Sequence, residues 1–122
     1  MATIVFYSND MVFPSRVAAY AAQTGVTLSI APVPSSFARQ LGPDTRLALV
    51  DLSMGDLDLP ALVQQVAVAS PEAKCLGFGP HVDEALLSGA KNAGFAMVLT
   101  RGQFQQSFPM ILAQLATQAP SN

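Results

Sequence analysis

The chain has 122 residues, which is enough for one domain with its own hydrophobic core. It carries a net charge of −2, and only 11% of its residues are charged, against about 25% in an average globular protein. Its six Lys and Arg residues are scattered singly along the sequence, so we expect no nucleic-acid binding, which needs clustered cations.

Short apolar runs alternate with longer amphipathic stretches from the first residue to the last. In chain order this pattern predicts strands at residues 3–8, 26–31, 46–51, 74–78 and 96–100. Between and after these strands it predicts helices at residues 12–23, 36–41, 59–69, 82–93 and 104–118. We expect residues 119–122 to be a frayed tail.

Several residues predict where the helices begin and end. Gly25 and Gly94 stand where the first and fourth helices should stop, and Asp58 stands where the third should be capped. Pro60 falls in the tolerated first turn of that third helix. Pro109 lies inside the last helix, where we expect it to kink the helix or delay its regular start.

Strands that alternate with helices predict a parallel sheet with both faces covered. We therefore expect one α/β domain, residues 1–118, with a flavodoxin-like (βα)5 fold. This fold is a doubly wound, five-stranded parallel sheet in the order 2-1-3-4-5 with helices on both faces. Ligands of such sheets bind beyond the carboxyl ends of the strands, at the point between strands 1 and 3 where the winding reverses.

Charged residues stand at or just beyond the ends of three predicted strands. Asp51 closes the third apolar run, Asp10 follows the first, and Arg101 follows the fifth. Because parallel strands end at the same edge of a sheet, we expect two carboxylates and one guanidinium to meet in a single crevice.

Residues 49–58 resemble the phosphorylation segment of receiver domains, the regulated domains of two-component response regulators. An apolar strand ends in Asp51, Met54 follows three residues later and Asp58 seven residues later. The resemblance extends over nearly the whole chain, and it implies that Asp51 is the phosphoacceptor. In the later segment, residues 93–102, Arg101 takes the position of the receiver Lys, so it is a candidate to contact a phosphoryl group.

Other positions depart from the receiver pattern. The pair Asn9 and Asp10 matches the acidic pair that helps to hold Mg²⁺, but one acid is replaced by an amide. Gly79 stands where receivers carry Thr or Ser, and Val98 stands where they often carry an aromatic residue. The resemblance therefore implies the receiver fold with an incomplete phosphorylation site, which is an atypical or pseudo-receiver.

The remaining side chains leave two interpretations of the site open. Asp10, Asp51 and Asn9, with waters, can form a weak Mg²⁺ site, because Mg²⁺ prefers oxygen ligands. Arg101 can neutralise a phosphoryl group at Asp51, or it can pair with Asp51 permanently. In the second case no phosphorylation occurs and the acid is structural.

Two further residues have a chemical and a structural interpretation. His81 precedes the fourth helix and is either a pH-sensitive group or, the interpretation we favour, an exposed loop residue beside a capping Asp83. Cys75 lies inside an apolar strand, where a small buried side chain is a better interpretation than a nucleophile.

We therefore expect a receiver-like signalling module that has no enzymatic activity and acts through contacts with other signalling proteins. Its contact surface is expected on the helix at 82–93, the strand at 96–100 and the helix at 104–118, where homodimerisation is also plausible. The alternative is a functional single-domain response regulator that a histidine kinase phosphorylates at Asp51 with Mg²⁺. A flavodoxin-like small-molecule binder is disfavoured, because the sequence has no phosphate-binding loop and no nucleophile–base pair.

Compartment and membrane association follow from what the sequence lacks. It has no basic start followed by an apolar core, and no apolar segment approaches the length of a membrane span. Its single Cys75 cannot form an internal disulfide, which suits a reducing compartment. We expect a cytoplasmic protein without membrane contact.

Overall fold

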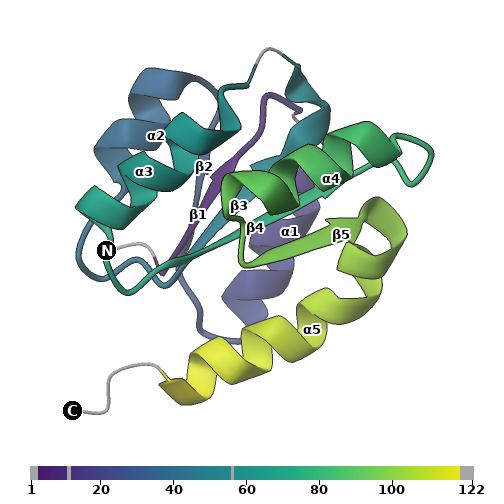
Figure 1. The fold of residues 1–122 in the computed structure, drawn as a ribbon. Helices are drawn as coiled ribbons and strands as arrows, with labels where there is room; N and C mark the ends of the chain where they lie inside the picture. The colour runs from purple at the N-terminus through teal and green to yellow at the C-terminus, as the bar shows by residue number, and fades with distance from the viewer. Residues whose placement is uncertain (1–2, 11, 56, 119–122) are drawn as a thin grey trace.

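The computed structural model describes residues 3–10, 12–55 and 57–118, and it contains five strands that alternate with five α-helices. Figure 1 shows the strands side by side between two layers of helices. In chain order the elements are β1 (Ile4–Tyr7), α1 (Val12–Gln23), β2 (Leu28–Ala31), α2 (Pro34–Gln40), β3 (Leu47–Asp51), the 3₁₀ turn η1 (Leu52–Met54), α3 (Leu59–Ala69), β4 (Lys74–Gly79), α4 (Glu84–Ala93), β5 (Met97–Thr100) and α5 (Arg101–Gln118).

All strand pairs are parallel, and the order across the sheet is β2-β1-β3-β4-β5. This confirms the predicted doubly wound topology. The register places Tyr7 of β1 beside Val50 of β3, and Asp51 beside Phe78 of β4. The ends of β1, β3 and β4 are therefore neighbours at one edge of the sheet.

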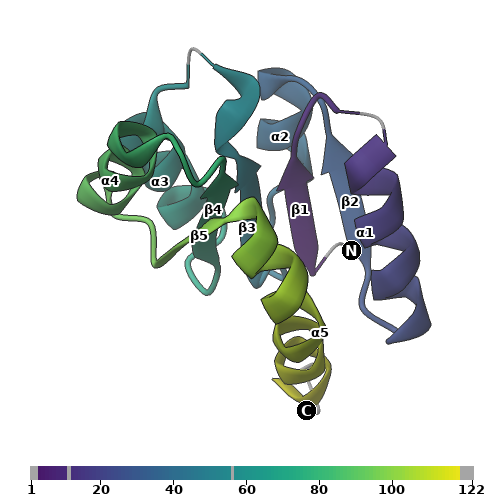
Figure 2. The same cartoon turned by 90° about the vertical axis from the view of Figure 1, so that its right-hand side faces the viewer.

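The helices divide between the two faces of the sheet (Figures 1 and 2). Side chains of α1 and α5 pack with one set of strand residues, and side chains of α2, α3 and α4 pack with the other. β1 is buried along its whole length, as expected of a strand covered on both faces. None of the helices in the part of the chain that the structure describes is long and apolar enough to cross a membrane.

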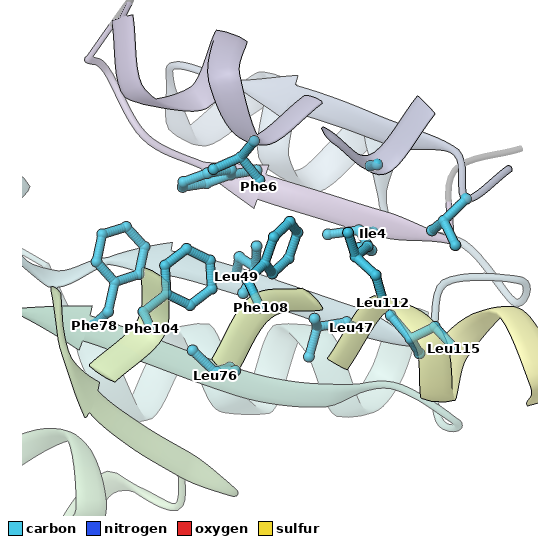
Figure 3. Packing of buried hydrophobic residues seen from close by; sticks show 13 residues of the cluster. Ile4, Phe6, Leu47, Leu49, Leu76, Phe78, Phe104, Phe108, Leu112 and Leu115 are labelled. Atoms are coloured by element: carbon cyan, nitrogen blue, oxygen red, sulfur yellow. The ribbon is translucent and has the colours of Figure 1, made fainter. Parts of the chain in front are cut away.

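Aromatic rings dominate the core between the sheet and the α1–α5 layer. Phe78 of β4 and Phe104 of α5 stack with ring centroids 4.7 Å apart, and Phe6 of β1 meets Phe78 edge to face at 5.7 Å (Figure 3). Phe13 of α1 lies against both Phe78 and Phe104. Because these contacts bring α1, α5, β1 and β4 together, the cluster fixes how the two helices approach the carboxyl edge of the sheet.

Three predicted caps, on two helices, are confirmed. Asp58 accepts a hydrogen bond from the N–H of Ala61 at the start of α3, and Asp83 accepts one from the N–H of Leu86 at the start of α4. Gly94 ends α4 in the left-handed conformation, with φ +108°. Because Asp83 is the cap, α4 begins at Glu84 and not at the predicted residue 82.

The expected start of α5 was wrong. The helix begins at Arg101, not at residue 104, and Pro109 does not delay it. Thr100 and Gln103 exchange two hydrogen bonds: the Thr100 N–H donates to Gln103 Oε1 at 2.9 Å, and the Gln103 N–H donates to Thr100 Oγ1 at 3.1 Å. This reciprocal cap starts the helix directly after β5, and it makes Arg101 the first helical residue.

The other differences are small. α2 begins at Pro34 because proline fits the first turn of a helix, whereas Pro34 was expected only to bound the preceding strand. β1, β2, β3 and β5 begin one or two residues later than predicted, and β4 runs one residue longer, to Gly79. The predicted frayed tail, residues 119–122, lies outside the described residues.

Gly77 allows two side chains to approach the middle of β4. A Cβ atom at this position would lie 3.0 Å from Leu52 Cδ1 and 3.1 Å from Phe95 Cδ2, which is tighter than most contacts of Cβ atoms in proteins. Gly89 differs, because a Cβ atom there would meet nothing within 4 Å.

We expect Gly77→Ala to lower the free energy of unfolding by about 1–3 kcal/mol, because the added methyl overpacks the core. Gly89→Ala, inside α4, is the matched control and should raise it by about 0.5–1 kcal/mol through helix propensity. Urea unfolding of both variants measures the two changes. An unchanged stability of Gly77→Ala would contradict the tight packing at β4.

Candidate functional site

Polar groups from the ends of β1 and β3 meet at the carboxyl edge of the sheet. Ser8 directly follows β1, and its hydroxyl donates to Asp51 Oδ2 at 3.0 Å. The same hydroxyl oxygen accepts from the backbone N–H of Asp10 at 3.2 Å. The structure thus brings the Asp10 backbone and the Asp51 carboxylate to the same side chain, at the switch point of the sheet.

The Asp51 carboxylate is buried, with 3% of the residue exposed. Its Oδ1 accepts from the hydroxyl of Ser53 at 2.6 Å and from the Ser53 backbone N–H at 3.1 Å. With the bond from Ser8, both oxygens of the acid have donors, as a buried carboxylate requires. These donors are neutral, and no ion pair between described residues includes Asp51.

Arg101 lies on aromatic rings instead of the acid. Its guanidinium carbon is 4.8 Å from the centre of the Phe13 ring and 5.6 Å from that of Phe78. Cation–π contacts of this kind contribute about 0.5–2 kcal/mol each, depending on how dry they are. The ion pair with Asp51, one of the two sequence interpretations, is not formed, although Phe78 stands beside Asp51 in the sheet register.

The residues predicted to hold Mg²⁺ provide few free oxygens. Asn9 is exposed and Asp10 is half-buried, while both oxygens of Asp51 already accept hydrogen bonds. Within residues 3–10, 12–55 and 57–118, no group of three or more His, Cys, Asp or Glu side chains is arranged to hold a metal ion. Oδ1 of Asp51 accepts two hydrogen bonds and Oδ2 accepts one, so one lone pair of the carboxylate, on Oδ2, is left for a metal ion.

The two positions that depart from the receiver pattern lie near this edge. Gly79 ends β4 and pairs with Thr100, and a Cβ atom added there would stay at ordinary contact distances, the nearest being 3.5 Å from Leu52 Cβ. A methyl group therefore fits at Gly79. Val98 is half-buried in β5 and packs with the core on the α2–α4 side.

Neither His81 nor Cys75 is among the residues that hydrogen-bond Asp51. His81 is exposed in the turn before α4, next to the cap made by Asp83. Cys75 is buried near the start of β4, and its burial raises the pKa of the thiol to about 11, so the reactive thiolate is scarce at neutral pH.

Sequence reasoning missed Ser8 and Ser53. A signal for Ser53 is present, because a hydroxyl residue two positions after an Asp commonly bonds back to it. Ser8 carries no such local signal. Its contact with Asp51 joins residues 43 positions apart, and it depends on β1 lying beside β3.

Solved structures of other proteins share the fold of this chain. No protein-family model and no curated protein sequence matches the chain. Among solved structures, a response regulator from Burkholderia pseudomallei, determined with a phosphorylated aspartic acid, a calcium ion and citrate, superposes with a TM-score of 0.75. The alignment covers 97% of this chain and 70% of that one, at 18% identity.

Two further structures agree. A response regulator receiver domain protein from Clostridium thermocellum gives a TM-score of 0.76 over 97% of this chain and 96% of that one, at 12% identity. The chain has the receiver-domain fold. A pilus assembly-related protein from Burkholderia pseudomallei shares it too, with a TM-score of 0.68 over 99% of this chain and 93% of that one, at 19% identity. At such identities the receiver fold is shared, but activity does not follow from it.

We expect Ser8→Ala to lower the free energy of unfolding by about 1–3 kcal/mol, because it removes a donor from a buried carboxylate. Ser53→Ala should cost less, since the Ser53 backbone N–H still donates to Asp51. Urea unfolding measures both losses, with the exposed Ser88→Ala on α4 as control. If Ser8→Ala costs the same in an Asp51→Ala background as in the wild type, the two residues are not coupled and the interpretation is wrong.

Proposed function

We propose that the protein is a receiver-like signalling module, without enzymatic activity, that acts through protein contacts and is little controlled by phosphorylation. One observation carries this proposal: both oxygens of Asp51 are already held by Ser8 and Ser53, while Arg101 lies on aromatic rings. The acid and the cation that the resemblance assigns to phosphoryl chemistry each have another partner.

Phosphorylation of a carboxylate has two requirements that this arrangement opposes. One carboxylate oxygen must be free to attack, and a cation must offset the charge that accumulates on the phosphoryl oxygens. At Asp51 only one carboxylate lone pair, on Oδ2, accepts no hydrogen bond, and a contact between Arg101 and the phosphoryl group would require Arg101 to leave Phe13 and Phe78. Gly79 adds no hydroxyl to contact a phosphoryl group.

The alternative is a functional single-domain response regulator, phosphorylated at Asp51 by a histidine kinase with Mg²⁺. Its support is positional: Asp51 ends β3 at the switch point, and Arg101 begins α5 beside the same edge. Under this alternative Arg101 exchanges its ring contacts for the phosphoryl group, and Asp10 and Asn9 contribute oxygens to the metal. A cytoplasmic location suits both proposals.

We expect no Asp51-dependent phosphorylation when the protein is incubated with acetyl phosphate and Mg²⁺. Intact mass spectrometry of the wild type and of Asp51→Ala measures this directly, and a reactive receiver domain treated in parallel is the positive control. A gain of one phosphoryl mass in the wild type, absent from Asp51→Ala, would overturn the pseudo-receiver proposal and establish the alternative.

The proposed contact surface consists of α4, β5 and α5. β5 is the last strand of the sheet and pairs only with β4 among the described strands, so one side of its backbone is open. Met97 on β5 is 45% exposed, and Val82, just before α4, is 77% exposed. Exposed apolar side chains beside an open strand edge favour contact with a partner, and a second copy of this chain is the simplest one.

We expect a concentration-dependent dimer in sedimentation equilibrium that Met97→Glu weakens about tenfold or more, because a charge would enter an apolar contact. Val68→Glu on α3 is the control: Val68 is also exposed, at 74%, but lies on another part of the surface. Equal weakening by the two variants, or a monomer at every soluble concentration, would contradict homodimerisation through this surface.

A further inference from the structure

A hollow of about 200 Å³ lies at the amino-terminal edge of the sheet, at the other end of the strands from Asp51. Its walls come from the starts of β3, β4 and β5 and from the C-terminal half of α5. Figure 2 shows α5 running past this edge of the sheet. The hollow shares no residue with the Asp51 site, although Met97, Ile111 and Leu115 in its wall belong to the proposed contact surface of α4, β5 and α5.

The floor of the hollow is apolar. Leu47 and Leu76 come from adjacent strands, and Leu115 comes from α5; all three are at least nine-tenths buried (Figure 3). Ile111, partly buried on α5, and Met97, half-exposed on β5, complete the apolar surface. A short hydrocarbon chain placed here is stabilised, because its apolar surface is removed from water.

Two cations stand beside this floor. Arg46 directly precedes β3 and Lys74 is the first residue of β4; the two are adjacent, since the Lys74 N–H donates to the Arg46 carbonyl at 3.1 Å. They are two of only six Lys and Arg residues in an acidic protein. Glu72 also lines the hollow, but the cations outnumber it.

Both cations have capacity for an anion. No ion pair between residues of the described ranges includes Arg46 or Lys74. Arg46 Nη1 donates to the Pro43 carbonyl at 3.1 Å, which uses one of the five N–H donors of the guanidinium. Cys75, another lining residue, adds no charge at neutral pH, because burial raises the pKa of its thiol to about 11.

We propose that this hollow binds a small organic anion with a short apolar chain. The carboxylate or phosphate head lies between Lys74 and Arg46, and the chain lies against Leu47, Leu76 and Leu115. The volume is below the roughly 300–1,000 Å³ of sites for drug-sized ligands, so nucleotides are too large. An anion without the apolar chain cannot make the contacts with the leucines, and an uncharged apolar molecule cannot pair with the two cations, so each should bind more weakly.

The test is a titration of ¹⁵N-labelled protein, followed by amide chemical shifts, with four probes: sodium hexanoate, hexyl phosphate, sodium acetate and hexanol. We expect hexanoate or hexyl phosphate to give saturable shifts at residues 74–76 and 111–115. Acetate should bind roughly tenfold or more weakly, since it lacks the chain. Hexanol should also bind more weakly, since it lacks the charge. Whichever of the two anions binds more tightly identifies the head group.

Lys74→Gln should weaken binding of the preferred probe about fivefold or more, because it removes a cation beside the head. Lys91→Gln on α4 makes the same change of charge away from the hollow, and it should leave the affinity unchanged. Asp51→Ala should also bind like the wild type, so this test stands whether or not Asp51 is phosphorylated.

Four results would each overturn the proposal. Hexanol could bind as tightly as the anions, which would make the site a non-specific apolar surface. The shifts could fail to saturate, or they could map outside the hollow, for example to the aromatic groove between α1 and α5 near Phe13, Tyr20 and Phe108. Finally, Lys74→Gln could weaken binding no more than Lys91→Gln does.

Discussion

Parallel pairing of β3 with both β1 and β4 decides where the polar groups of this protein lie. The register brings the residues that follow Tyr7 beside Asp51, and Asp51 beside Phe78. Every strand therefore ends at the same edge, and a carboxylate that ends the central strand is buried unless the loops open around it. Burial of that acid requires donors, and the loops provide Ser8 and Ser53. The pairing of the strands therefore determines the position of the acid and its need for hydrogen-bond donors.

The sequence was sufficient to predict the strands, their order and most helix ends, because each rests on a local or periodic signal. Asp58 and Gly94 act through their nearest neighbours in the chain, and alternation of strands with helices leaves few topologies open. The start of α5 was predicted three residues too late, although Thr100 and Gln103 have the spacing of a capping box.

The candidate site was predictable in position but not in its contacts. That the backbone of Asp10 lies near the Asp51 carboxylate, with Ser8 between them, follows from strand ends alone. Whether Arg101 turns to the acid or to the rings depends on where α1 places Phe13, which is a matter of tertiary packing. Two charges that the sequence pattern suggested as a pair are instead stabilised separately, one by neutral hydroxyls and one by aromatic faces. A ligand at this edge has to compete with both arrangements.

The short edge strand has a further consequence for how the protein behaves in concentrated solution. β5 contains four residues, so the row of open backbone groups on its outer side is short. Many proteins carry Lys or Pro in an edge strand, which discourages pairing with the strand of another molecule, but β5 contains neither. The pI is about 5.0 and charged residues are few, so charge repulsion between molecules fades under mildly acidic conditions. Near that pH, the shortness of β5, and of β2 at the other edge of the sheet, limits pairing between strands of different molecules.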